Sequence, residues 1–147
     1  MGILDKFSLE GRIALVSGGA GAMFGSSISE ALAEAGATVV TASRSLERNR
    51  EFAERMKGEG FDVHPMQLDI TEPDSIEALR VGVMEQFGRV DVLVNSSVVG
   101  RGGGFEDQTA EYWEYSAQGN MVGLMAMCRG FIPEMVEQGR GSVINIS

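Results

Sequence analysis

The fold is decided by residues 12–36, which read RIALVSGGAGAMFGSSISEALAEAG. Residues 12–17 are a short apolar run that ends in glycines, which is typical of a strand buried on both faces of a parallel sheet. Over residues 26–35 the apolar side chains recur at helical spacing, and Gly36 stands where a glycine commonly ends a helix. The stretch therefore predicts a strand, a glycine-rich turn and a helix, in that order.

The same alternation of strand and helix continues along the chain. Further strands are predicted over residues 37–42, 61–68, 90–95 and 142–147. Helices are predicted over residues 47–58 and 109–138, and a third helix is predicted to follow Thr71, which would be its N-cap residue. Pro65 favours an edge position for the third strand, because proline cannot donate to a ladder. Alternating elements imply parallel strands joined by right-handed crossovers. We therefore expect a single α/β domain over residues 1–147, a doubly wound parallel sheet of about five strands in the order 3-2-1-4-5.

The composition excludes several classes of function. The chain has 147 residues, of which 44% are apolar, and its 21 acidic against 12 basic residues give a net charge of −9. Scattered Arg and Lys residues do not form the cationic cluster that binds phosphate backbones, so nucleic acid is not expected as a partner. A single cysteine, Cys128, and a single histidine leave neither a disulfide framework nor a Cys/His metal set. No apolar run approaches the roughly 18 residues of a membrane span, so we expect no membrane partner and a cytoplasmic location.

Four glycines lie between the first strand and the first helix: Gly18, Gly19, Gly21 and Gly25. Without a Cβ the backbone can turn sharply and approach a ligand, and the helix N-terminus offers free N–H groups and a positive dipole end. This arrangement favours a pyrophosphate as the ligand. The last glycine stands one place later than in the dinucleotide-binding fingerprint, and the alternative interpretation is an ordinary glycine-rich turn.

The end of the second strand bears on which dinucleotide is bound. A carboxylate at this place would bind the 2′-hydroxyl of the adenosine ribose, but this chain has Ser43 and Arg44 there. No negative charge repels a 2′-phosphate, and a guanidinium can form a fork with one. The sequence therefore favours NADP over NAD as the cofactor. In the alternative interpretation, Arg44 is a solvated residue of a basic stretch that also contains Arg48 and Arg50.

Several short motifs occur in order along the chain. They are VSGGAGAMFGSSIS from Val16, ASR from Ala42, LDIT from Leu68, DVLVNSS from Asp91, GNMVG from Gly119 and SVINIS from Ser142. With these motifs the sequence resembles the classical short-chain dehydrogenases/reductases, and among them the gluconate- and polyol-type oxidoreductases. The resemblance implies a Rossmann-like fold and hydride transfer between a nicotinamide cofactor and an alcohol, ketone or sugar.

The resemblance also implies roles for individual residues around the cofactor. The four glycines would line the pyrophosphate, with Ser17 bracing their turn. Asp69 and Ile70 would meet the adenine, while Asn95 would stabilise its strand and, with Ser96, border the cofactor. Two departures from the family pattern are one additional residue in the glycine turn and the sequence Asn-Ser-Ser-Val, from Asn95, in place of Asn-Asn-Ala-Gly.

The catalytic residues that the family implies are only partly present. Asn120 matches the asparagine that holds a proton-relay water, and Ser147 is the nearest candidate for the catalytic serine. A phenol accepts the carbinol proton only where a cation lowers its pKa, and the family uses a Tyr-x-x-x-Lys pair for this step. Neither Tyr112 nor Tyr115 is followed by a lysine four places on. We therefore interpret the chain as the cofactor-binding half of a short-chain reductase, truncated before the catalytic half and without turnover on its own.

The long helix predicted over 109–138 carries more apolar residues than one helix face needs. They are Met121, Leu124, Met125, Cys128, Phe131, Ile132 and Met135. An uncovered fifth strand would add an apolar sheet edge that favours pairing with another chain. We therefore expect a homo-oligomer formed through the long helix and the fifth strand, although the same residues could simply pack on the sheet. The alternative function is a non-catalytic fragment that binds NADP(H) or only associates with other chains.

Overall fold

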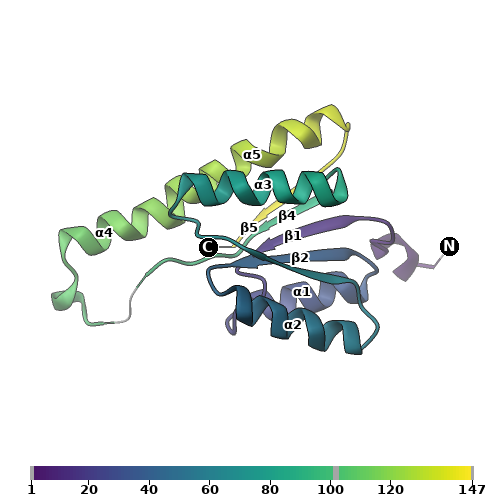
Figure 1. Cartoon of the computed structure of the whole chain (residues 1–147), viewed down its shortest axis with the longest axis horizontal. Helices are drawn as coiled ribbons and strands as arrows, with labels where there is room; N and C mark the ends of the chain where they lie inside the picture. Colours follow the sequence, from purple (N-terminus) through teal and green to yellow (C-terminus); the bar gives the residue numbers. More distant parts are fainter. Residues whose placement is uncertain (1, 101–102, 147) are drawn as a thin grey trace.

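The structure is a computed structural model that describes residues 2–100 and 103–146. Its centre is a parallel sheet of five strands in the order β3-β2-β1-β4-β5 (Figure 1). The strands are β1 (Ile13–Ser17), β2 (Thr38–Ser43), β3 (Val63–Gln67), β4 (Val92–Asn95) and β5 (Ser142–Asn145). The predicted doubly wound sheet and its strand order are confirmed, and the order reverses between β1 and β4.

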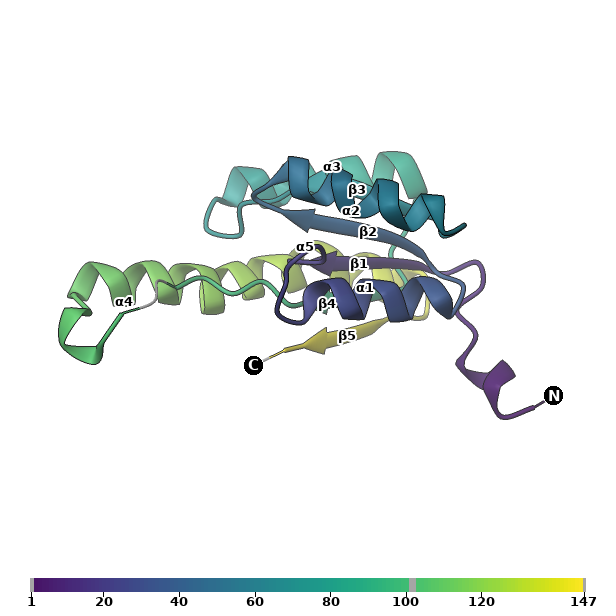
Figure 2. The ribbon, with the colours of Figure 1, turned by 90° about the horizontal axis from the view of Figure 1, so that it is seen from below.

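Helices cover both faces of the sheet. Helices α1 (Gly25–Glu34) and α2 (Leu46–Gly58) lie on one face, and α3 (Pro73–Phe87) and α5 (Leu124–Glu137) lie on the other (Figure 1). The remaining elements are η1 (Leu4–Phe7), η2 (Phe105–Asp107), α4 (Ala110–Ala117) and a π-helical turn, η3 (Gln118–Gly123). Figure 2 shows that α4 extends beyond the end of the sheet. Among the described residues, no helix is both long and apolar enough to cross a membrane.

Two features of the predicted helices are wrong. Thr71 does not cap α3, because its hydroxyl donates to the carboxylate of Asp69 over 2.6 Å; the helix begins at Pro73, after Glu72 as the N-cap residue. Proline suits this first position because its missing N–H has no partner there in any case. The long helix predicted over 109–138 is also not uniform, since η3 separates α4 from α5.

The sheet divides the core into two apolar layers. Along β1, Ala14 and Val16 belong to the layer beneath α1 and α2, whereas Leu15 belongs to the layer beneath α3 and α5. This alternation follows from the period of two in a strand. β1 is buried on both faces, as its continuous apolar run predicts.

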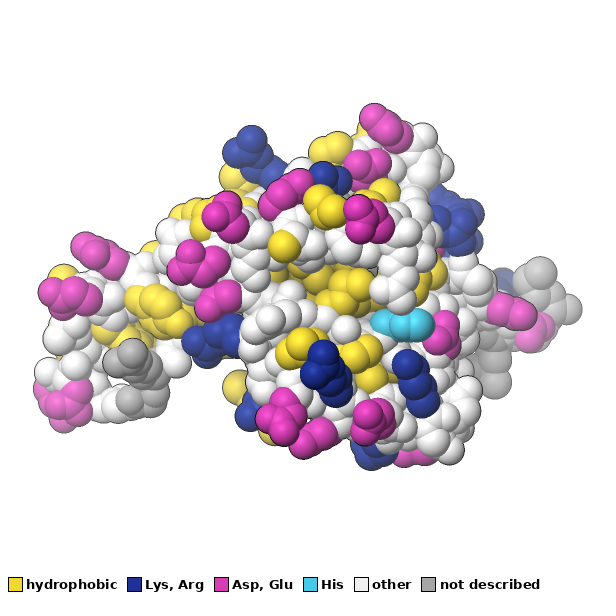
Figure 3. All heavy atoms as spheres, in the orientation of Figure 1, with side chains coloured by type: hydrophobic (Ala, Val, Ile, Leu, Met, Phe, Trp, Pro, Cys, Tyr) yellow, Lys and Arg dark blue, Asp and Glu magenta, His cyan; other side chains and the backbone are white. Residues whose placement is uncertain are grey.

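The two edges of the sheet differ in how they are covered. β3 is an edge strand, as Pro65 predicts, and apolar side chains are visible between α2 and α3 over it (Figure 3). β5 is the other edge, and all four of its residues are exposed, including Val143 and Ile144. The edge predicted to be uncovered is therefore found at β5.

Helix α5 and the adjoining turn η3 are apolar on two opposite sides. Met127, Phe131 and Met135 are buried against the sheet, at a spacing of four residues. Met121, Met125 and Ile132 are exposed on the outer side, together with Val136. Leu124 and Cys128 are half-buried between the two sides. Packing on the sheet therefore accounts for only part of the apolar residues of the long helix.

The amino ends of three strands meet at one carboxylate. Asp91, just before β4, accepts a hydrogen bond of 2.9 Å from the backbone N–H of Ile13. Its oxygens also lie 3.0 Å from Arg89 Nε, 3.0 Å from Arg140 Nε and 3.5 Å from Arg12 Nη1. Burial acts to raise the pKa of Asp91, but the Ile13 N–H and the three guanidinium charges outweigh it and leave the pKa below its usual range. This carboxylate fastens the sheet at the end opposite to the glycine turn.

Candidate functional site

The glycine turn between β1 and α1 is too closely packed for a side chain at any of its four glycines, Gly18, Gly19, Gly21 and Gly25. Gly18 has a φ of 71°, and a Cβ there would lie 3.0 Å from the carbonyl oxygen of Ser96. A Cβ at Gly25, the first residue of α1, would overlap the carbonyl oxygen of Gly18. Within this turn the Ser26 N–H donates over 3.0 Å to the oxygen of Gly21, five residues earlier.

The start of α1 presents unused backbone donors. Its N-cap residue, Phe24, makes no capping hydrogen bond through its side chain. Within the described residues, the N–H groups of Met23, Gly25 and Ser27 have no protein acceptor. Such donors, together with the positive end of the helix dipole, favour an anion. The turn thus fits the diphosphate of a dinucleotide.

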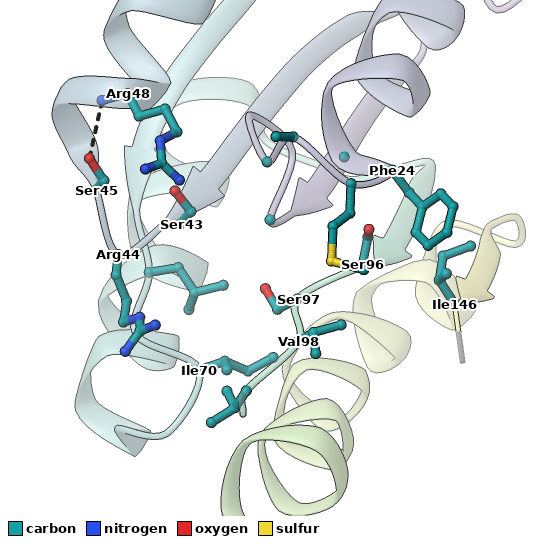
Figure 4. A pocket seen from close by; sticks show the side chains of 17 residues that line it. Phe24, Ser43, Arg44, Ser45, Arg48, Ile70, Ser96, Ser97, Val98 and Ile146 are labelled. Carbon is teal, nitrogen blue, oxygen red and sulfur yellow. Dashed lines mark hydrogen bonds between the residues drawn. The ribbon is translucent and has the colours of Figure 1, made fainter. Parts of the chain in front are cut away.

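A cavity of about 600 Å³ opens beside this turn. It lies at the carboxyl ends of the strands, where the strand order reverses, which is the usual ligand site of a doubly wound sheet. Of the predicted site residues, those that line it are Gly18, Gly21, Gly25, Ser43, Arg44, Ile70 and Ser96. Phe24 lies at its side, next to Ile146, and is 57% exposed, so its ring does not fill the space (Figure 4).

Ser17 and Gly19 lie behind the cavity and hold its walls together. The hydroxyl oxygen of the fully buried Ser17 accepts hydrogen bonds from the N–H groups of Ser96, at 3.1 Å, and Ser97, at 3.2 Å. The hydroxyl of Ser29, on α1, donates to the oxygen of Gly19 over 2.8 Å. The glycine turn is therefore bonded both to the loop after β4 and to α1.

The side of the cavity next to the end of β2 carries two arginines. In Figure 4 the side chains of Arg44 and Arg48 lie on either side of Ser43, the last residue of β2. No carboxylate is present among the described residues that line the cavity. The sequence interpretation assigned Arg48 only to a solvated stretch. Its position in the first turn of α2, directly after β2, is the signal that places it beside Arg44.

Asp69 shapes the loop after β3 and does not line the cavity itself. Its carboxylate accepts from the N–H of Thr71 at 3.0 Å and from the Thr71 hydroxyl at 2.6 Å. Burial acts to raise the pKa of Asp69, but these two hydrogen bonds and the charge of Arg44 lower it further than burial raises it. The compact loop presents the next side chain, Ile70, to the cavity.

Asn95 lies beneath the cavity and ties two strands together. Its Nδ2 donates to Oδ1 of Asn145 on β5 over 2.9 Å and lies 3.6 Å from Sγ of Cys128, while its buried Oδ1 has no partner in residues 2–100 and 103–146. No group of three or more His, Cys, Asp or Glu side chains in the same residues is arranged to hold a metal ion.

Asn120, on the π-helical turn, holds the loop that forms the far wall of the cavity. Its Nδ2 donates to the oxygen of Val99 over 2.7 Å, and its Oδ1 accepts from the N–H of Val99 at 2.8 Å. Gly119 lets this loop come close, since a Cβ there would overlap the Val99 side chain. The proton-relay role of Asn120 stays a prediction, and the other catalytic candidate, Ser147, lies outside the described residues.

Comparisons with known proteins agree with this geometry. A family model described as short chain dehydrogenase matches residues 12–147. Among curated proteins, the 2,5-dichloro-2,5-cyclohexadiene-1,4-diol dehydrogenase of Sphingobium indicum is 32% identical over 139 residues, which make up 95% of this chain and 55% of that protein. The chain thus spans little more than half the length of this relative.

Two solved structures share both the fold and the sequence. A gluconate 5-dehydrogenase from Burkholderia cenocepacia, in complex with NADP and tartrate, matches with a TM-score of 0.87 and 29% identity, over 97% of this chain and 55% of its own. A metagenomic short-chain oxidoreductase in complex with NADP has a TM-score of 0.87 and 32% identity, over 95% and 63% of the two chains. The strand order, the glycine turn and a match over most of the sequence lead to one family: the chain belongs to the short-chain dehydrogenases/reductases.

Proposed function

We propose that the chain binds NADP(H) in this cavity as the cofactor-binding part of an oxidoreductase acting on alcohols, ketones or sugars. The observation that carries the proposal is the pair Arg44 and Arg48 on either side of Ser43, with no carboxylate among the described lining residues. The cofactor, when bound, supplies or accepts the hydride. The residues of this chain bind it and fix its orientation. Residues 1–147 act in this proposal as one dinucleotide-binding domain.

The diphosphate is proposed to bind at the start of α1. The N–H groups of Gly25 and Ser27 are free to donate to its oxygens, and Gly18 and Gly21 leave room for them in the cavity wall. Charge-assisted hydrogen bonds from backbone N–H groups are the stronger kind, so this turn supplies much of the affinity shared by NADP and NAD.

The 2′-phosphate is proposed to bind between the two arginines. Arg44 and Arg48 both line the cavity, and a guanidinium presents a rigid fork of N–H donors to a phosphate. NAD has a hydroxyl at this place and gains nothing from the two positive charges. NADP is therefore the preferred cofactor and NAD the alternative. Two solved relatives support this choice, because both are described in complex with NADP.

Titration of the purified chain with NADPH and NADH, followed by calorimetry or nucleotide fluorescence, tests the proposal. Wild-type protein is expected to bind NADPH more tightly than NADH. Arg44→Ala and Arg48→Ala should each weaken NADPH binding about tenfold or more, since a hydrogen-bonded charge contributes about 1.5–3 kcal/mol. Arg50→Ala is the matched control, because Arg50 is exposed on α2 and does not line the cavity. Absence of binding for both nucleotides would contradict the proposal.

Binding without turnover is proposed for the isolated 147 residues. Neither Tyr112 nor Tyr115 has a lysine four places on, so no phenol of this chain is activated in the way the family requires. Asn120 is proposed to hold the proton-relay water of the whole enzyme, and Ser147 is the nearest candidate for the catalytic serine. The chain should therefore change the fluorescence of NADPH without oxidising it in the presence of ketones or sugars.

We propose that copies of the chain associate through the exposed apolar residues of η3, α5 and β5. Met121, Met125 and Val136 are exposed on η3 and α5, and Val143 and Ile144 are exposed on the edge strand β5. Their burial against a second copy would remove apolar surface from water. A homo-oligomer is therefore expected in solution. We also propose that the protein works in a reducing, cytoplasmic environment. The basis for this is that its sequence has a single cysteine, Cys128.

A further inference from the structure

Arg44 is bonded to a residue from a distant part of the chain. Its Nη1 donates to the phenolic oxygen of Tyr115 over 3.0 Å, although the two residues are 71 positions apart. Tyr115 is on α4, and its half-buried ring packs against the apolar cluster that includes Ile70 and Val99. The core thus fixes the ring, and the phenolic oxygen becomes a fixed acceptor for Arg44, which lines the cavity.

The hydrogen bond orders Arg44 without reducing its charge. A phenol is a neutral acceptor, whereas a carboxylate in its place would form an ion pair and oppose the binding of a second anion. Arginine has five N–H donors, and the bond to Tyr115 uses one of them. The backbone of Arg44 is held as well, because Nε2 of Gln67 donates to its carbonyl oxygen over 3.3 Å. The guanidinium therefore keeps both its charge and donors for a ligand.

We propose that Tyr115 is a positioning residue that increases the preference for NADP over NAD by holding the Arg44 guanidinium in place for the 2′-phosphate. The inference rests on the proposed function, since it requires a phosphate at Arg44. An exposed arginine loses side-chain entropy when a ligand orders it. Tyr115 removes part of that loss before the cofactor binds, which is the advantage of a preorganised site. NAD, which has no 2′-phosphate, does not benefit.

A purely structural role is the competing explanation for the same bond. In that case the Tyr115 hydroxyl would only fasten α4 to the sheet. Other contacts already hold this part of the chain: the hydroxyl of Ser116, on α4, donates over 3.3 Å to the oxygen of Val99 in the loop after β4, and Asn120, on the adjoining η3, binds Val99 through two hydrogen bonds. Loss of one hydroxyl from α4 is therefore expected to leave the fold intact and to affect NADPH alone.

The test is Tyr115→Phe, which keeps the ring and removes the acceptor, with NADPH and NADH dissociation constants measured by calorimetry. The NADPH constant is expected to rise about three- to tenfold, the effect of one hydrogen bond, while the NADH constant stays unchanged. Tyr112→Phe is the matched control, because this neighbouring hydroxyl lies near Gly100 and makes no bond to Arg44. In an Arg44→Ala background, Tyr115→Phe should have no further effect on NADPH binding.

Each other outcome counts against the inference and locates the error. If Arg44→Ala lowers the preference for NADPH but Tyr115→Phe does not, Tyr115 has no positioning role and the proposed function stands. Equal weakening of both nucleotides, with a lower unfolding midpoint, would show that the hydroxyl only fastens α4. If the wild-type chain binds neither nucleotide, the inference and the proposed function both fail.

Discussion

Gly25 packs against the carbonyl oxygen of Gly18 so closely that no side chain fits at position 25. The contact joins the first turn of α1 to the end of β1. Gly25→Ala must therefore displace the helix, which we expect to lower the free energy of unfolding by about 1–3 kcal/mol, as other overpacking changes do. NADPH affinity should fall by at least tenfold, because the displaced N–H groups no longer meet the diphosphate.

Urea unfolding and NADPH titration measure the two effects of this substitution. Gly58→Ala, at the end of α2, is the control, because nothing lies within 4 Å of a Cβ there. It should be neutral or stabilise the chain by up to about 1 kcal/mol, since alanine is the better helix former. A Gly25→Ala protein with wild-type stability and NADPH affinity would contradict this prediction, because it would show that the turn has room for a Cβ at position 25.

The pH dependence of stability is expected to follow Asp91. Its pKa is lowered in the folded chain, so its contribution is complete above the unfolded-state pKa of about 3.9 and is lost as the pH falls through the lower folded value. Asp91→Asn should lower the free energy of unfolding at pH 7 by about 1–3 kcal/mol, because the three arginines lose their common partner but regain water. Urea unfolding of both proteins between pH 7 and pH 3 tests this. Equal pH dependence in the two would exclude Asp91 as the titrating group.

The loop around Val99 is expected to open when Asn120 is shortened. Asn120→Ala removes both of the hydrogen bonds to the Val99 backbone, so the Val99 amide should exchange with solvent at least tenfold faster. Ser116→Ala is the control: it removes the 3.3 Å bond to the same carbonyl and the 3.1 Å bond that Asn120 Nδ2 donates to the Ser116 hydroxyl, but it leaves both Asn120–Val99 bonds in place. Hydrogen exchange followed by NMR reports on this single amide. Unchanged exchange in Asn120→Ala would mean that other contacts hold the loop.

Self-association is expected to depend on the exposed side of α5. Met125→Glu places a charge in the apolar surface that a second copy would cover, so the oligomer should dissociate at micromolar concentration. Glu137→Gln, at the end of the same helix, is expected to leave the mass unchanged. Size-exclusion chromatography with light scattering measures both. A monomeric wild-type protein would remove the basis for the proposed interface.

Much of the fold could be predicted because each signal was local. The apolar run at β1 acts through the burial of its own side chains, whereas the glycines after it and Pro65 at the sheet edge act through their own backbones. The structure agrees with all three signals. Thr71 failed as a helix cap because a competing acceptor, the Asp69 carboxylate, lies two residues away. Local propensity does not show which of two neighbouring partners a hydroxyl will choose.

The candidate site was less predictable because its contacts join distant segments. The Arg44–Tyr115 bond connects the end of β2 with α4. Asn120 contacts the loop after β4 from a π-helical turn, which no residue spacing in the sequence predicts. Such pairs exist only once the sheet has brought the segments together. Arg48 is different: the sequence interpretation did not assign it to the site, although its place in the first turn of α2, directly after β2, was a local signal that could have done so.

Ser17 has a consequence for how a nucleotide would enter. One oxygen atom accepts the amides of both Ser96 and Ser97, so the glycine turn and the loop after β4 cannot separate gradually. Any widening of the gap between them breaks both hydrogen bonds together and leaves the fully buried Ser17 hydroxyl oxygen without these partners, at a cost of about 1–3 kcal/mol. The width of the cavity is thus fixed before a nucleotide binds. Association should therefore proceed in one kinetic phase, without a preceding opening step.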